Sequence, residues 1–121
     1  MGEVLIMEMQ VHLHPDIFEI VLNGKKNVEA RVNDEKRRKL KVGDTLVFLK
    51  RPLEDEIIKA KVTKLEYYPN FKELVKNYDI ERLYLKEFTK SEYLDALATF
   101  YTDEEQEQYG VVAISFKIIK E

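Results

Sequence analysis

Cysteine and tryptophan are absent from the 121 residues, which include only four glycines and three prolines. Without cysteine the chain has no disulfide, thiolate metal site or cysteine nucleophile, as is typical of a reducing compartment. Charged residues interrupt every hydrophobic run, so none approaches the roughly 20 apolar residues that span a bilayer. The apolar start is broken by Glu8 and does not resemble a signal peptide. We therefore expect a cytoplasmic protein with no membrane partner.

The length and charge predict one domain over residues 1–121 with an uneven surface. The formal net charge is -3, which gives no overall attraction to a polyanion. Positive charge is concentrated between Lys36 and Lys41, whereas Glu54–Glu56 and Asp103–Glu107 are acidic. Binding to nucleic acid must therefore be local, and the acidic Asp103–Glu107 segment offers a surface for a protein partner.

Local signals predict alternating helices and strands. Pro15 in a first turn and Gly24 after an apolar stripe bound a helix, and Asp34 can cap a short one. Asn70, Thr89 and Thr102 each precede a Glu by three residues, which indicates further helix starts. Strands are predicted over residues 28–32, 45–49, 57–68 and 111–119, the third with Ala60, Val62 and Tyr68 on one face.

The segment 28–32 carries the most informative charges. Strand alternation places Glu29 and Arg31 on one face, about 7 Å apart along the chain. Lys26 lies in the preceding connection, from which its ammonium can reach the same side. Such a pair can neutralise itself on a half-solvated strand or hold a ligand.

These residues also carry a family resemblance. Gly24, Lys26, Glu29 and Arg31 match the Gly-x-Lys-x-x-Glu-x-Arg signature of ASCH domains, the small proteins homologous to part of the activating signal cointegrator. Similar blocks follow in the family's order at residues 33–44, 68–74 and 109–114. The resemblance implies an α+β fold: a small PUA-like β-barrel of mixed, mostly antiparallel strands, with several short helices packed at one side.

The same residues predict a ligand site. A pocket for a nucleobase or phosphate needs a cation, a carboxylate and an apolar wall. Lys26, Arg31 and Glu29 supply the charges, and Tyr68 and Tyr109 are candidate walls, although core lids are the alternative for both. For four other aromatic residues we expect core packing: Phe71, Tyr93, Phe100 and Tyr101.

We therefore predict an RNA- or nucleotide-binding module without cofactor or metal, whose partner is RNA or a nucleotide-like small molecule. Arg37 and Arg38, within the basic run, are candidate phosphate contacts, and solvated surface is the alternative for them.

Hydrolysis of a modified nucleoside or RNA is the competing hypothesis. ASCH amidohydrolases place a Thr nucleophile three residues after the Lys, where this chain has Glu29, so that mechanism does not transfer. A variant remains in which Glu29 is the general base and Lys26 stabilises developing charge. His12 and His14 form a weaker alternative, either as a ribonuclease pair or as metal ligands without a clear third partner.

Overall fold

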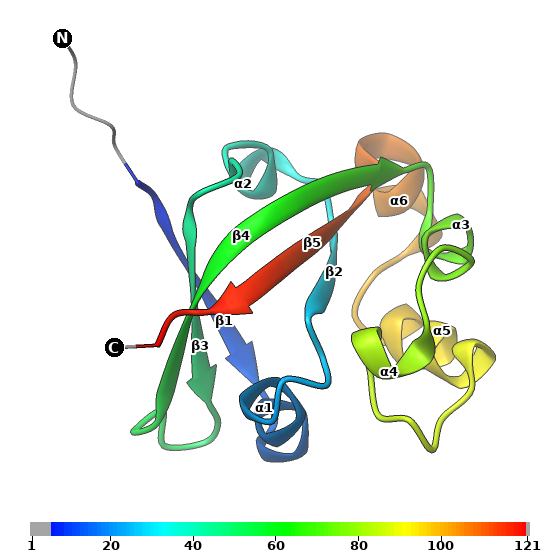
Figure 1. Cartoon of the computed structure of the whole chain (residues 1–121). Coiled ribbons are helices and arrows are strands. Elements are labelled where there is room, and N and C mark those ends of the chain that lie inside the picture. Colours follow the sequence, from blue (N-terminus) through cyan, green and yellow to red (C-terminus); the bar gives the residue numbers. More distant parts are fainter. Residues whose placement is uncertain (1–5, 121) are drawn as a thin grey trace, which may run out of the picture.

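The computed structural model describes residues 6–120, over which the chain forms five strands and six helices (Figure 1). The strands are β1 (Glu8–Leu13), β2 (Val28–Val32), β3 (Thr45–Lys50), β4 (Ile57–Tyr68) and β5 (Val111–Ile118). The helices are α1 (Pro15–Leu22), α2 (Glu35–Arg38), α3 (Phe71–Val75), α4 (Ile80–Leu83), α5 (Lys90–Ala98) and α6 (Asp103–Tyr109). Most of the residues that bear on the signal-peptide prediction lie outside the described range.

The strands form one curved sheet in the order β1-β3-β4-β5-β2. Strands β1 and β3 are parallel, and the other three pairs are antiparallel. Figure 1 shows α1 at the lower end of the curved sheet, while α3 to α6 gather beyond β5 and β2. The predicted α+β fold of mixed, mostly antiparallel strands with short helices at one side is therefore confirmed, and the sheet forms a half-barrel.

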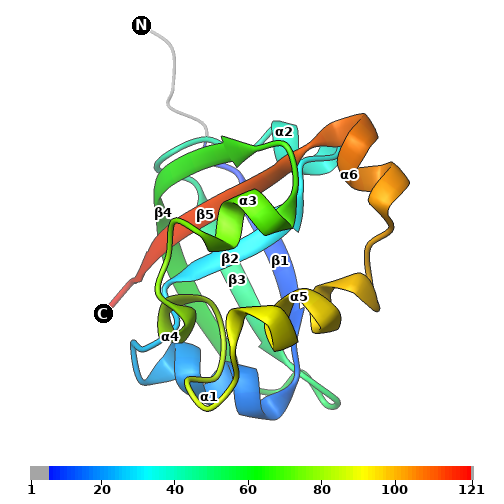
Figure 2. The same cartoon turned by 90° about the vertical axis from the view of Figure 1, so that its right-hand side faces the viewer.

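Two hydrophobic cores share the sheet as a common wall. The first lies inside the curl, where Phe18 and Val21 of α1 meet inward residues of the strands such as Phe48. The second lies between the outer face of β2 and β5 and the helices α3 to α6 (Figure 2). Successive side chains of β5 point to opposite faces of the sheet, so Ile114 is buried in the first core and Ala113 in the second.

The predicted helix starts are confirmed by their caps. The side chains of Asp34, Asn70, Thr89 and Thr102 each accept a hydrogen bond from the backbone N–H three residues later. Thr89 and Thr102 form complete capping boxes, since the Glu side chain bonds back to the cap. At the C-terminal end of α6, Gly110 adopts a φ of 69°, a conformation that other residues rarely tolerate.

Two expectations about aromatic side chains are wrong. Phe100 is 70% exposed, because it follows the last turn of α5 and lies outside the second core. Tyr68 does not share a face with Ala60, because an irregularity between Val62 and Lys64 shifts the register of β4. Ala60 packs in the first core and Tyr68 against the second.

The sheet also fixes how the second half of the chain is attached. Tyr68 at the end of β4 is the register partner of Val111 at the start of β5. The helices α3 to α6 therefore lie between two residues that are neighbours in the sheet.

Among the described residues, none of the helices is long and apolar enough to cross a membrane.

Candidate functional site

Lys26 is a buried lysine that joins distant parts of the chain. It is 3% exposed, and its Nζ donates to the carbonyl oxygens of Val28 at 2.8 Å and Leu83 at 2.7 Å. Leu83 ends α4, so the ammonium ties that helix to the start of β2. Burial lowers the pKa of Lys26 below its ordinary value, although Glu29 opposes the effect. Lys26 thus reaches the Glu29 side of the strand, as the sequence predicts.

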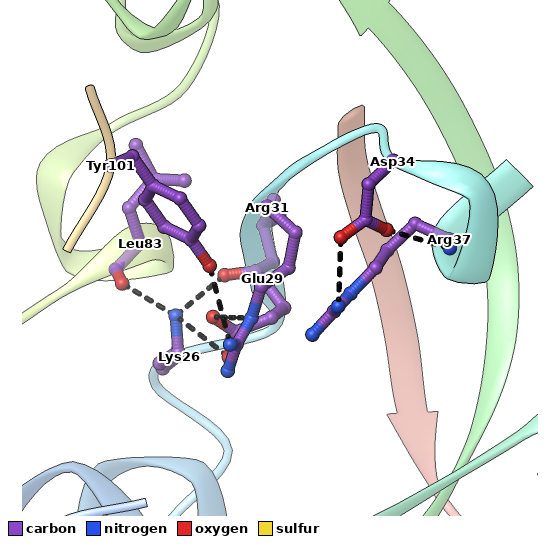
Figure 3. Close-up of polar contacts among 8 residues, drawn as sticks. Lys26, Glu29, Arg31, Asp34, Arg37, Leu83 and Tyr101 are labelled. Carbon is purple, nitrogen blue, oxygen red and sulfur yellow. Dashed lines mark hydrogen bonds and ion pairs between the residues drawn. The ribbon is translucent and has the colours of Figure 1, made fainter. Parts of the chain in front are cut away.

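Glu29 lies between two cations. Its Oε1 is 3.4 Å from Arg31 Nε and its Oε2 is 3.7 Å from Lys26 Nζ (Figure 3). Only 7% of the residue is exposed, so a solvated strand face does not describe it. We call Lys26, Glu29 and Arg31 the β2 cluster. The structure brings these three predicted residues together.

Tyr101 and Tyr93 complete the surroundings of the cluster. Arg31 Nη1 donates to the Tyr101 hydroxyl at 3.4 Å. Burial opposes the charge on Arg31, but Glu29 and Tyr101 outweigh it, so the pKa of Arg31 is raised and its guanidinium stays protonated. Burial, followed by the Glu29 carboxylate, also raises the pKa of the Tyr93 phenol. The cluster is therefore a charged site on the first-core face of the edge strand β2, with Tyr93 and Tyr101 of the helical layer beside it.

The short helix α2 places two arginines differently. Arg37 Nη1 is 3.3 Å from Asp34 Oδ2, and Figure 3 shows its side chain running from α2 toward Arg31. Arg38 points elsewhere, because its Nε donates to Asn33 O at 2.9 Å and its guanidinium lies 5.7 Å from the centre of the Tyr109 ring. Arg37 is thus directed toward the β2 cluster, whereas Arg38 is bound to neighbouring backbone.

A stretch around the site contains unusual unpaired atoms. Among the described residues, four buried side-chain atoms have no hydrogen-bond partner: Glu29 Oε2, Arg31 Nε, Asn33 Oδ1 and Arg37 Nε. All four lie between Glu29 and Arg37, at the junction of β2 and α2. Buried polar groups are normally paired, so each exception calls for a physical reason. Two donors and two acceptors at this junction therefore lack a hydrogen bond, and two of them, Arg31 Nε and Glu29 Oε2, are held only by ion pairs at 3.4 and 3.7 Å.

The two predicted tyrosine walls lie in other surroundings. Tyr68 packs against the second core, with its ring edge-on to Tyr78 at a centroid distance of 6.5 Å. Tyr109 lines a groove of about 820 Å³ between β1 and α2, together with Lys36 and Lys39. We call this the α2 groove. Its other lining residues are Met7, Glu8, Met9, Gln10, Asp34 and Glu35.

The remaining candidates are scattered. His12 Nδ1 is 2.6 Å from Glu54 Oε1, and both side chains are exposed. Within residues 6–120 no three His, Asp or Glu side chains gather as a potential metal site. The acidic helix α6 contributes Asp103, Gln106 and Glu107 to a second cleft of about 460 Å³.

Sequence reasoning missed three parts of the site: the Leu83 carbonyl, Tyr93 and Tyr101. The sequence pattern does not indicate which backbone carbonyl a side chain will contact, and it predicts core packing for both tyrosines. Tyr93 is indeed buried, at 5% exposure, but it also neighbours the charges of the cluster. The sequence predicts only core packing for Tyr93.

The family follows from a match over nearly the whole chain. The model of the ASCH domain matches residues 11–120. The chain belongs to the ASCH domain family. The resemblance seen in the Lys26 to Arg31 signature is therefore confirmed.

Two solved structures are similar to nearly the whole chain. The crystal structure of hypothetical protein PH0355 shares 33% identity and a TM-score of 0.80, covering 93% of this chain and 100% of that one. The solution NMR structure of protein PF0455 from Pyrococcus furiosus shares 29% identity and a TM-score of 0.75, covering 95% of this chain and 100% of that one.

A more distant structure supports the fold alone. The crystal structure of ASCH from Zymomonas mobilis shares 16% identity and a TM-score of 0.56, covering 91% of this chain and 66% of that one. No curated protein matches the chain.

Proposed function

We propose that this ASCH domain binds RNA or a nucleotide-like ligand at the β2 cluster, and that it does so in the cytoplasm. The observation that carries the proposal is the buried carboxylate oxygen Glu29 Oε2, which lacks a hydrogen-bond partner beside two cations. Membership of the ASCH family supports a ligand of the RNA kind. The charge of the whole molecule does not, so the attraction is local.

Each member of the cluster has a separate role in this proposal. Glu29 accepts hydrogen bonds from the N–H groups of a base, which is how a carboxylate reads a nucleobase edge. Arg31 supplies a permanent positive charge for an anionic group. Lys26 is a positioning residue, because its bonds to two carbonyl oxygens fix its ammonium beside Glu29.

The α2 groove extends the proposal to longer ligands. Tyr109, Lys36 and Lys39 line it, and Arg38 neighbours Tyr109, so a strand of RNA leaving the cluster would meet phosphate-binding cations there. Tyr68 has no part in this arrangement, since it packs against the second core.

Hydrolysis is less well supported by the same contacts. A stabilising Lys26 would have to give up its bonds to Val28 and Leu83 to polarise a substrate oxygen. Burying those carbonyl groups without a donor is unfavourable. The geometry therefore favours binding over catalysis by Glu29 and Lys26.

The test is amide-shift NMR with a nucleoside, its monophosphate and a short single-stranded RNA. We expect saturable shifts from Lys26 to Arg31, weakened by salt for RNA. Arg31→Ala and Glu29→Gln should abolish these shifts, whereas Arg51→Ala, at an exposed position, should leave them unchanged.

Two outcomes would change the conclusion. An absence of shifts at millimolar ligand contradicts binding at the cluster and moves the search to protein partners of α6. Product formed from the nucleoside or RNA, and lost in a folded Glu29→Gln variant, establishes hydrolysis instead.

A further inference from the structure

The junction of β2 and α2 carries more unused hydrogen-bonding capacity than the β2 cluster alone. The backbone N–H of Asn33 donates to Gly110 O at 2.9 Å, which continues the pairing of β2 with β5 by one residue. Alternation then places Glu29, Arg31 and Asn33 on one face of the strand. Each of these three side chains has a buried atom without a hydrogen-bond partner, although Arg31 Nε lies 3.4 Å from Glu29 Oε1.

Arg37 adds a fourth such side chain from outside the strand. Asp34 is the N-cap of α2, and its side chain accepts a hydrogen bond from the Arg37 backbone N–H at 3.1 Å. The Asp34 carboxylate also holds one end of the Arg37 guanidinium, at 3.3 Å, and leaves Nε unpaired. In Figure 3 the ends of the Arg31 and Arg37 side chains extend to the same side of the segment that joins them.

The local charge suits an anion. Lys26, Arg31 and Arg37 carry three positive charges and Glu29 and Asp34 carry two negative ones, which leaves +1 at the junction of a molecule whose net charge is -3. The guanidinium group offers paired N–H donors that match the oxygens of a phosphate. Asn33 Oδ1 is an acceptor, which a phosphate oxygen cannot satisfy but a ribose hydroxyl can.

We infer that Arg31 and Arg37 together form a phosphate site at the β2–α2 junction, so that the ligand is a phosphorylated nucleotide and not a free nucleoside. The inference rests on the proposed function, since Glu29 faces the base while the two arginines hold the phosphate next to it.

The experiment compares inorganic phosphate, a nucleoside and its monophosphate with the intact protein, by following the Nε–H signals of the arginines and the backbone amides by NMR. We expect phosphate alone to shift the Arg31 and Arg37 Nε–H signals. We expect the monophosphate to bind about tenfold or more tightly than the nucleoside, the scale of one or two hydrogen bonds to a charged group.

Substitutions of single arginines test the role of Arg37 in this site. Arg37→Gln should lower monophosphate affinity about tenfold and leave nucleoside affinity unchanged. Arg51→Gln is the matched control, because Arg51 is an exposed arginine outside this junction, and both affinities should stay within about twofold. Arg37→Lys keeps the charge without the planar group and should give an intermediate affinity, even if the Gln variant folds poorly.

The results distinguish this inference from the proposed function. If the nucleoside binds at Lys26 to Arg31 but its phosphate adds no affinity, the phosphate site is refuted and the proposed function stands. If inorganic phosphate shifts the two arginines while the nucleoside shifts nothing, the anion site stands and recognition of a base is refuted. If no compound shifts either region, both are wrong.

Discussion

Replacing Lys26 with methionine tests whether this lysine is a positioning residue or a ligand contact. Methionine keeps the length of the buried side chain but removes the ammonium that donates to Val28 O and Leu83 O. It also leaves Glu29 with Arg31 as its remaining cationic neighbour in the cluster, at 3.4 Å. The substitution should therefore destabilise the protein even when no ligand is present.

The size of the effect follows from burial. Removing one partner of a buried ion pair costs about 3–5 kcal/mol, because the remaining charge stays desolvated. The two carbonyl groups add to this, since each buried acceptor left unpaired costs about 1–3 kcal/mol. Methionine offsets part of the loss because it avoids the desolvation that lowers the pKa of Lys26. We expect a net loss of about 3–5 kcal/mol from the free energy of unfolding.

Urea unfolding followed by far-ultraviolet circular dichroism measures this loss, since the chain has no tryptophan for fluorescence. Lys25→Met is the matched control, because Lys25 is exposed and its loss should change stability by less than about 0.5 kcal/mol. The double variant Lys26→Met with Glu29→Gln should lose less than the sum of the single losses, because no carboxylate is then left buried. A loss below about 1 kcal/mol for Lys26→Met would refute the positioning role.

Two further predictions concern pH and helix capping. Burial and then Glu29 raise the pKa of the Tyr93 phenol above its ordinary value of 10.0, so above that pH only the unfolded chain releases this proton and stability falls. Thermal melts should therefore show a shallower alkaline loss for Tyr93→Phe than for the wild type, and equal slopes would contradict the assignment. Thr102→Ala removes the cap of α6 and should cost about 1 kcal/mol in urea unfolding, whereas the exposed Thr63→Ala should cost less. Equal losses from the two threonine variants would show that the capping box contributes nothing.

Local features of the fold were predictable from the sequence. The caps at Asp34, Asn70, Thr89 and Thr102 depend on residues only three positions apart, and the structure contains all of them. Strand β4 was predicted with its observed bounds because its alternation is long. The pairing of β1 with β3 was not predicted, since a parallel contact between distant segments has no local signal. Helix α4 is a single turn whose cap makes no side-chain hydrogen bond, so it was missed.

The candidate site was predictable only along the strand. The spacing of Glu29 and Arg31 on β2 placed them together, because strand geometry is regular. The contact between Lys26 and the helical layer was not predictable, because Leu83 lies more than fifty residues later in the chain. Tyr68 shows the opposite case, in which one irregularity in β4 moved a side chain to the other face.

Because Tyr68 pairs with Val111, the helices α3 to α6 form an insertion between two residues that are already neighbours in the sheet. A short hairpin turn could close the same gap, and the first core would keep its strands and α1. Strand β2 contributes Glu29 and Arg31 to the site, while the inserted helical segment contributes Leu83 and Tyr101. Strand β2 thus provides the charged side chains, and the inserted helical segment provides residues that surround them. Replacing the inserted helical segment is a route by which such a half-barrel acquires a new ligand while its strands stay unchanged.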